Sequence, residues 1–156
     1  MSISRVKDYL SKYNLEDRIM EFDTSSATVS EAALALDCSE GEIAKTLSFY
    51  VNDMPILIVV AGDEKIDNHK YKQLFHVKSK MIPYDEVESV IGHGVGGVCP
   101  FGVNDGIKIY LDESLKRFSK VYPACGSSNS AIGLTIKQLE EIVNYESWID
   151  VCKSVE

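Results

Sequence analysis

The strongest constraint on the fold is a pair of strand-like segments joined by a short polar turn. The first, KTLSFYV (45–51), is rich in β-branched and aromatic residues, and the second, PILIVVAG (55–62), contains the longest apolar run of the chain. Both have the length and composition of β-strands, and Asn52 and Asp53 between them are turn formers. The sequence therefore predicts an antiparallel β-hairpin over these residues.

Further helices and strands are predicted on both sides of this hairpin. Helical spacing and capping-box patterns indicate helices, whereas apolar alternation indicates strands. The predicted helices are residues 2–14, a helix opened by Thr28, a short turn opened by Ser39, about 67–75, about 84–91, and a last helix opened by Thr135. The predicted strands are 18–22, 107–112, 121–125 and 131–135. Because strands and helices do not alternate strictly, we expect an α+β fold.

Length and composition favour one ordinary globular domain. The chain has 156 residues, of which 45% are hydrophobic and 26% are charged, as in a folded domain with a single core. We therefore expect one domain over residues 1–156. No apolar run approaches the roughly 18 residues of a membrane span, and the N-terminal MSISRVKDYL lacks the apolar region of a signal peptide. These features predict a cytoplasmic protein without a membrane partner.

The charge pattern restricts the class of partner. A net charge of −8 argues against broad electrostatic capture of nucleic acid, and DNA is not an expected partner. Residues 65–80, KIDNHKYKQLFHVKSK, differ from this pattern because they carry five lysines and two histidines against one aspartate. This segment is either a local basic face or an ordinary solvated helix surface, and the sequence leaves both interpretations open.

The cysteines indicate neither a disulfide framework nor a metal site. Cys38, Cys99, Cys125 and Cys152 contain no CxxC pair, and their spacings fit no zinc ribbon or finger. A zinc site made from Cys99, Cys125 and His93 would lack a close pair of ligands to nucleate it, so we predict no metal. Without an export signal, the thiols are expected to be reduced.

The segment GVGGVCPFG (94–102) is a nearly bare backbone ribbon. Its glycine spacing is neither a GxGxxG fingerprint nor a Walker loop. Glycine lets a backbone approach a ligand closely, and Pro100 restrains the ribbon. Such a loop can direct successive N–H groups at a carbonyl or phosphate oxygen. It can equally be a tight connection between elements, and composition does not decide between the two.

Three other features could carry chemistry. Lys45 opens a predicted strand among apolar neighbours, so it either needs a phosphate or carbonyl partner or extends its amine to the surface. CGSSNS (125–130) could bind a ligand by hydrogen bonds or could be an ordinary turn. Cys99 could be a nucleophile with a histidine as base, but no protease signature surrounds it, which favours a structural thiol.

Taken together, three segments resemble the YbaK/prolyl-tRNA-synthetase-associated domain, a family of aminoacyl-tRNA editing proteins. The segments are TVSEAALALDCSEGEIAKTLSFYV (28–51), GVGGVCPFG (94–102) and VYPACGSSNSAIGLTIKQLEEI (121–142). They stand in the order and spacing of the family, and the resemblance covers roughly residues 18–145. The combination of IAKTL with a GGxxPFG loop gives the resemblance its specificity, since either motif alone would be weak.

The resemblance implies a fold, an activity and a site. The implied fold is a mixed, strongly curved β-sheet that forms an irregular barrel flanked by helices. The implied activity is that of a trans-editing aminoacyl-tRNA deacylase, which hydrolyses the ester between a wrong amino acid and the tRNA 3′ end without a metal or organic cofactor. Lys45 matches the essential lysine of the family. The implied substrate-binding residues are Gly96, Gly97, Val98, Cys99, Pro100, Thr24, Ser25, Ala124, Cys125, Gly126 and Ser127.

The resemblance also implies partners and a substrate class. The partner is the 3′ end of a mischarged tRNA, with prolyl-tRNA synthetase or an elongation factor helping to discriminate between tRNAs. Residues 65–80 are the expected tRNA-facing surface. The substrate is prolyl-tRNA carrying a small wrong residue, although residues 124–129 depart from the branch that edits cysteinyl-tRNA. Three alternatives remain: a non-catalytic relative that binds tRNA ends or a synthetase, a hydrolase of another small acyl ester, and a cysteine enzyme.

Overall fold

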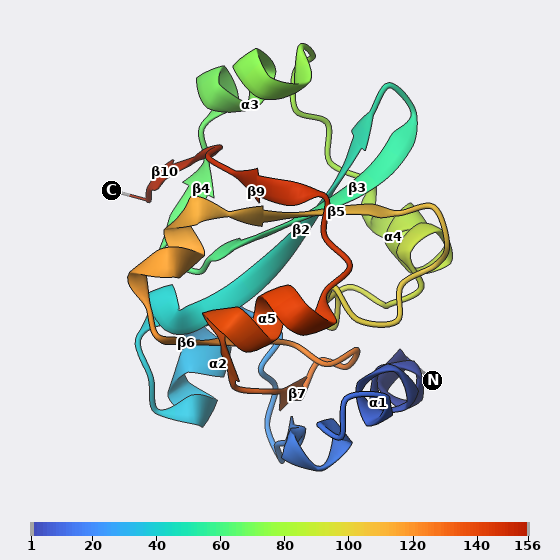
Figure 1. Ribbon diagram of the computed structural model, residues 1–156, viewed down its shortest axis with the longest axis vertical. Helices are drawn as coiled ribbons and strands as arrows, with labels where there is room; N and C mark the ends of the chain where they lie inside the picture. Colours follow the sequence, from blue (N-terminus) through green and yellow to red (C-terminus); the bar gives the residue numbers. More distant parts are fainter. Residues whose placement is uncertain (1, 156) are drawn as a thin grey trace.

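The computed structural model describes residues 2–155 and contains a six-stranded mixed sheet that curls into an open half-barrel (Figure 1). In order across the sheet, the strands are β8 (Leu134–Thr135), β6 (Lys120–Pro123), β2 (Ile43–Val51), β3 (Met54–Ala61), β5 (Lys108–Asp112) and β9 (Ser147–Ile149). Two small antiparallel sheets pair β1 (Met20–Glu21) with β7 (Ser130–Ala131) and β4 (Glu64–Ile66) with β10 (Cys152–Ser154).

The predicted hairpin is confirmed as β2 and β3, which pair antiparallel along their whole length. Asn52 and Asp53 both have positive φ, 50° and 67°, as the tight hairpin turns that match strand twist require. β3 also pairs with β5, and β5 with β9, and both of these pairings are parallel. The predicted α+β class and the predicted mixed, curved sheet are therefore both confirmed.

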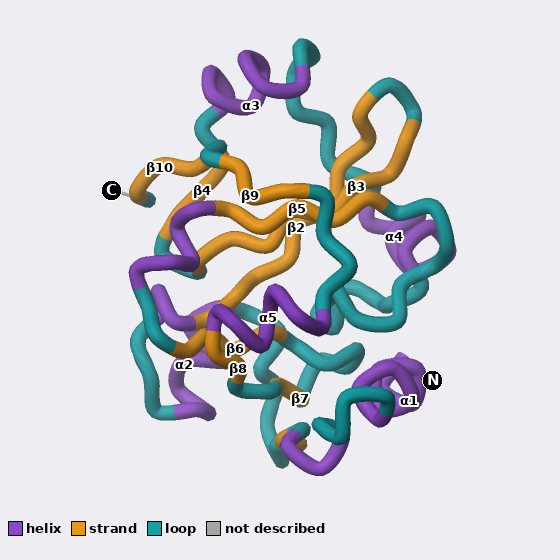
Figure 2. The backbone as a smooth tube through the Cα atoms, viewed as in Figure 1, coloured by secondary structure: helices purple, strands orange, loops and turns teal. Residues whose placement is uncertain are grey.

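Five α-helices surround this sheet (Figure 2). They are α1 (Ser2–Ser11), α2 (Val29–Leu36), α3 (Asn68–Phe75), α4 (Tyr84–Ile91) and α5 (Ile136–Ile142), with short 3₁₀ turns at Glu16–Arg18, Glu40–Glu42 and Glu113–Arg117. The capping boxes predicted at Thr28, Ser39 and Thr135 are all formed. Within residues 2–155, none of the helices combines the length and apolar character needed to traverse a bilayer.

The predicted strand 131–135 is divided in the structure. Residues up to Ala131 pair with β1, and residues from Leu134 pair with β6, so Ile132 and Gly133 connect two different sheets. A Cβ on Gly133 would lie 2.6 Å from the Lys120 side chain and 2.8 Å from the Tyr122 ring. Gly133, where the chain passes from one sheet to the other, therefore stands at a position too crowded for a Cβ without movement of these neighbours.

The core lies on both faces of β3. Leu57, Val59 and Ala61 belong to the larger cluster, which also contains the buried Cys99 and Cys125. The alternate residues Ile56, Ile58 and Val60 belong to a second cluster beneath α3 and the C-terminal segment. Since both faces of the strand are covered, both sets of alternating side chains are apolar, which explains the unbroken apolar run.

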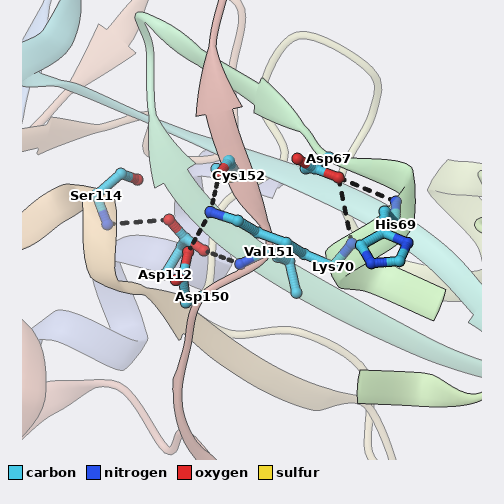
Figure 3. Close-up of polar contacts among 8 residues, drawn as sticks. All are labelled: Asp67, His69, Lys70, Asp112, Ser114, Asp150, Val151 and Cys152. Atoms are coloured by element: carbon cyan, nitrogen blue, oxygen red, sulfur yellow. Dashed lines mark hydrogen bonds and ion pairs between the residues drawn. The ribbon is translucent and has the colours of Figure 1, made fainter. Parts of the chain in front are cut away.

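A buried carboxylate fastens the C-terminal segment to the sheet (Figure 3). Asp112 is 1% exposed and accepts hydrogen bonds from the backbone N–H groups of Ser114 and Val151, each at 2.9 Å. Beside it, the Lys70 amine donates to the carbonyl oxygen of Cys152 at 2.8 Å. β5, α3 and the last strand are therefore joined at one place.

Candidate active site

A cavity of about 330 Å³ lies beside β2. Its walls come from residues 43–48 of β2, the start of α2, the start of α4, the glycine ribbon, and the segments around β6 and β7. This volume is at the lower end of the range for small-molecule sites. Lys45, Gly96, Val98 and Ala124 are the predicted site residues that the fold brings together here.

Lys45 is half-buried in the wall of this cavity. Burial lowers the pKa of its amine, while the charges of Cys152, Asp63 and Glu64 act in the opposite direction. Within residues 2–155, no hydrogen bond or ion pair engages this amine. A partly desolvated lysine without an anionic partner can bind a phosphate or carbonyl oxygen of a ligand.

The glycines of the ribbon have two different roles. Gly96 borders the cavity with a positive φ of 95°, a conformation that glycine adopts without strain. Gly97 instead packs against the backbone of the CGSSNS segment, and its carbonyl oxygen accepts from the N–H of Gly126 at 3.0 Å. Gly97 therefore forms a tight connection between two segments, whereas Gly96, one residue away, borders the cavity.

The remaining predicted site residues lie outside this cavity. Cys99 and Cys125 are fully buried in the core. Pro100 borders a second cavity beside α1, of about 490 Å³. Gly97, Gly126 and Ser127 border a third cavity of about 640 Å³, on the other side of the ribbon. Thr24 and Ser25 are exposed, and the next residue, Ser26, is the first to line the main cavity.

The Cys99 thiol lacks the features of a nucleophile. It has no exposed surface, and burial raises its pKa to about 12. The nearest base is His93, whose Nε2 lies 3.6 Å from the sulfur and 2.6 Å from the carbonyl oxygen of Phe101. Nε2 must carry a proton to donate to that oxygen, so it cannot accept one from the thiol. The geometry favours a structural thiol. Across residues 2–155, no group of three or more metal-ligating side chains is assembled.

Several residues of the cavity were not predicted from the sequence. Thr46 and Ser48 line it from β2, and Ile82 and Val87 from the region of α4. Tyr84, which is 78% exposed, also lines it. Thr46 and Ser48 could have been recognised in the sequence, because hydroxyl side chains at alternate positions of an apolar strand lie on one face. Ile82 and Val87 could not, since their position at the cavity depends on the path of the chain.

The lysine-rich segment does not form one continuous basic face. Lys70 turns inward, with its amine 3.0 Å from the Asp150 carboxylate, as Figure 3 shows. Lys80 lies over the ring of Tyr50 at 5.9 Å and directly precedes Met81, which lines the cavity mouth. Only the last part of the segment adjoins the candidate site.

Comparison with known proteins gives four matches of note. The model of a family described as "Aminoacyl-tRNA editing domain" matches residues 23–142. The chain is 51% identical over 157 residues to the protein YwhH of Bacillus subtilis (strain 168), which is described as uncharacterized, and the match covers 100% of both. It is 30% identical over 110 residues to a proline–tRNA ligase of Streptococcus equi subsp. equi (strain 4047), covering 68% of this chain and 18% of the ligase. A crystal structure described as a candidate trans-editing enzyme for prolyl tRNA synthetase superposes with a TM-score of 0.87 at 28% identity, covering 98% of each chain.

Proposed function

The chain belongs to the aminoacyl-tRNA editing domain family, and from this premise we propose that it is a trans-editing deacylase. It hydrolyses the ester that joins a wrong amino acid to the 3′ end of a tRNA. The observation that carries this proposal is the cavity in which Lys45 of the IAKTL motif faces the same space as Gly96 of the glycine ribbon. Lys45 and Gly96 are 51 positions apart in the sequence, and a shared site gives a common reason for both motifs.

The chemistry requires little beyond positioning. An activated ester is hydrolysed when a water molecule is held near its carbonyl carbon and donors stabilise the developing oxyanion. In the proposed mechanism, water is the nucleophile, and Lys45 holds a phosphate or ribose oxygen of the tRNA end. A protonated lysine is a poor base near pH 7, so we assign it positioning rather than proton abstraction.

The proposed substrate is prolyl-tRNA that carries a small wrong amino acid. Its support is the likeness to a proline–tRNA ligase and to a candidate trans-editing enzyme for prolyl tRNA synthetase. A cavity of about 330 Å³ that must also admit part of the terminal ribose leaves room only for a small side chain. The net charge of −8 disfavours a wide grip on the tRNA body, so we propose that a synthetase or elongation factor helps to select the tRNA.

The test is deacylation of tRNA for proline carrying alanine, cysteine, serine or threonine. We expect the protein to cleave at least one of these esters faster than its spontaneous hydrolysis, and Lys45→Ala to fall to the spontaneous rate. Lys153→Ala, which removes an exposed lysine of β10, controls for the loss of one positive charge. Binding of the tRNA without turnover of any ester would overturn the deacylase proposal and favour a non-catalytic relative.

A further inference from the structure

The cavity borders the edge of β2 rather than one of its faces. Six consecutive residues of this strand, 43–48, line it. Side chains alternate between the two faces of a strand, so a cavity on one face would be lined by every second residue. A continuous run of lining residues requires that the cavity lie at the edge of the strand, where it contacts the backbone and the side chains of both faces.

The hydrogen-bond pattern shows which backbone groups point to this edge. The N–H of Gly62 donates to the carbonyl oxygen of Ile43 at 2.7 Å, so the odd-numbered residues of β2 bond to β3, and the even-numbered residues direct their N–H and C=O groups to the opposite edge. On that edge Ala44 pairs with Pro123 of β6. Further along, the carbonyl oxygen of Ser48 accepts from the N–H of Ile82 at 3.1 Å.

Thr46 lies between these two paired positions. No residue in the described range 2–155 is registered opposite Thr46 on this edge. Its side-chain hydroxyl is also buried without a hydrogen-bond partner among those residues. The open part of the edge is one residue pair long, and the residues around it, Ala44, Thr46, Ser48 and Ile82, all line the cavity. Unpaired backbone groups at a sheet edge are a ready template for another extended backbone.

We propose that this gap binds the aminoacyl group of the substrate as the missing strand residue. This inference rests on the proposed function. The carbonyl oxygen of Thr46 accepts from the α-ammonium group, and its N–H donates to the ester carbonyl oxygen. An amino acid carries a donor and an acceptor at the spacing of a strand residue. Because the edge is closed by Pro123 on one side and by Ile82 on the other, a single residue fits and a longer peptide does not.

The same contact acts in the reaction. When water adds to the carbonyl carbon, the electron pair of the C=O bond moves to the oxygen, and the N–H of Thr46 donates to the resulting oxyanion. Collapse of this intermediate re-forms the C=O bond and breaks the bond to the ribose oxygen. The ribose oxygen takes up the proton lost by the attacking water and leaves as the tRNA hydroxyl, and the free amino acid is released. In an antiparallel pair, the amino acid side chain lies on the same face as Thr46, toward Ile82 and Val87 in the larger core cluster.

The first experiment is the Thr46→Pro substitution. Among the backbone hydrogen-bonding groups, proline removes only the N–H that points to the open edge, so the ladder with β3 is retained. We expect a folded protein whose deacylation rate is about 10²- to 10³-fold lower, as when one oxyanion donor is lost. Leu47→Pro is the matched fold control: its N–H faces β3 opposite Ile58, and its loss should unfold the hairpin. A folded Thr46→Pro protein with wild-type activity would overturn the inference.

The second experiment changes the substrate and leaves the protein intact. N-acetylation of the aminoacyl-tRNA removes the ammonium charge and extends the chain beyond one residue. We expect cleavage by the wild-type protein, relative to the spontaneous rate of each ester, to fall at least about tenfold, the equivalent of one lost hydrogen bond to a charged group. Equal rates for acetylated and free esters would overturn the inference even if Thr46→Pro does not fold. A wild-type protein that cleaves neither ester would instead count against the proposed function.

Discussion

Gly97 leaves no room for a side chain. A Cβ built on it would lie 2.5 Å from the carbonyl carbon of Gly126 and from the amide nitrogen of Ser127, so the backbones of the ribbon and of the CGSSNS segment are in direct contact. Gly94, three residues earlier, would place a Cβ 3.5 Å from the Glu88 carboxylate, an ordinary contact with a flexible side chain. A methyl group is therefore expected to destabilise the fold at Gly97 and to be tolerated at Gly94.

At this scale we predict that Gly97→Ala lowers the free energy of unfolding by about 1–3 kcal/mol, the usual cost of overpacking. Gly94→Ala should change it by less than about 1 kcal/mol, and can stabilise the protein by reducing the entropy of the unfolded chain. Urea denaturation of the two variants and the wild type makes the comparison. Equal stability of the two variants would show that the contact between the ribbon and Gly126 relaxes without cost.

Among the elements, the last two strands depend on one side chain of β5. Asp112 uses one carboxylate oxygen for the N–H of Ser114 and the other for the N–H of Val151. The nearby ion pair between Lys70 and Asp150 involves side chains that are 39% and 65% exposed. Buried hydrogen bonds to a charge are worth more than exposed ion pairs, because water competes for the exposed groups.

For these elements we predict that Asp112→Asn lowers the free energy of unfolding by about 1–3 kcal/mol, because the amide has one acceptor oxygen and leaves one buried N–H unpaired. Asp150→Asn, which breaks only the exposed pair, should cost less than about 1 kcal/mol. Thermal and urea denaturation measure both effects. A larger loss for Asp150→Asn would mean that the surface pair, and not the buried carboxylate, fastens the C-terminal segment.

For the whole molecule, buried thiols connect stability to pH. Cys99 and Cys125 lie in the larger core cluster and Cys152 in the second. Burial raises the pKa of all three thiols, to about 12 for Cys99, whereas an unfolded chain has cysteine pKa values near 8.5. The folded state therefore holds protons that the unfolded state releases. The contribution of these thiols to the free energy of unfolding is fully present below about pH 8.5. As the pH rises above this value, the free energy of unfolding falls by about 1.4 kcal/mol per pH unit for each thiol.

We predict that the free energy of unfolding decreases steeply between about pH 9 and pH 10 in the wild type, and less steeply in Cys99→Ala, which lacks one of the three buried thiols. Urea denaturation at several pH values under reducing conditions gives the slope. The cavity that alanine leaves lowers stability equally at each pH, so only the slopes are compared. Parallel slopes would exclude a contribution from the Cys99 thiol.

Most of the local structure and the family could be predicted from the sequence alone. The hairpin, all five α-helices and the three capping boxes follow from nearest-neighbour chemistry, because turn, cap and periodicity signals act within a few residues. The motifs IAKTL and GGVCPFG predicted the family, and Lys45 and Gly96 do border one cavity. The parallel pairings were not predictable from the sequence. The last strands were not predictable either, since segments as short as β9 and β10 carry too few alternating positions for a periodic signal.

The shape of the site, in contrast, depends on how distant segments pack together. It placed Cys99 and Cys125 in the core, and it placed Gly97 against Gly126 instead of beside the cavity. Within residues 2–155, it also left Thr46 unpaired on the edge of β2 that faces away from β3, between the end of the β6 pairing and Ile82. The physical reason is that a strand edge stays unpaired only where no neighbouring segment of the chain reaches it. That depends on the path of residues distant in the sequence, which no local pattern in β2 records.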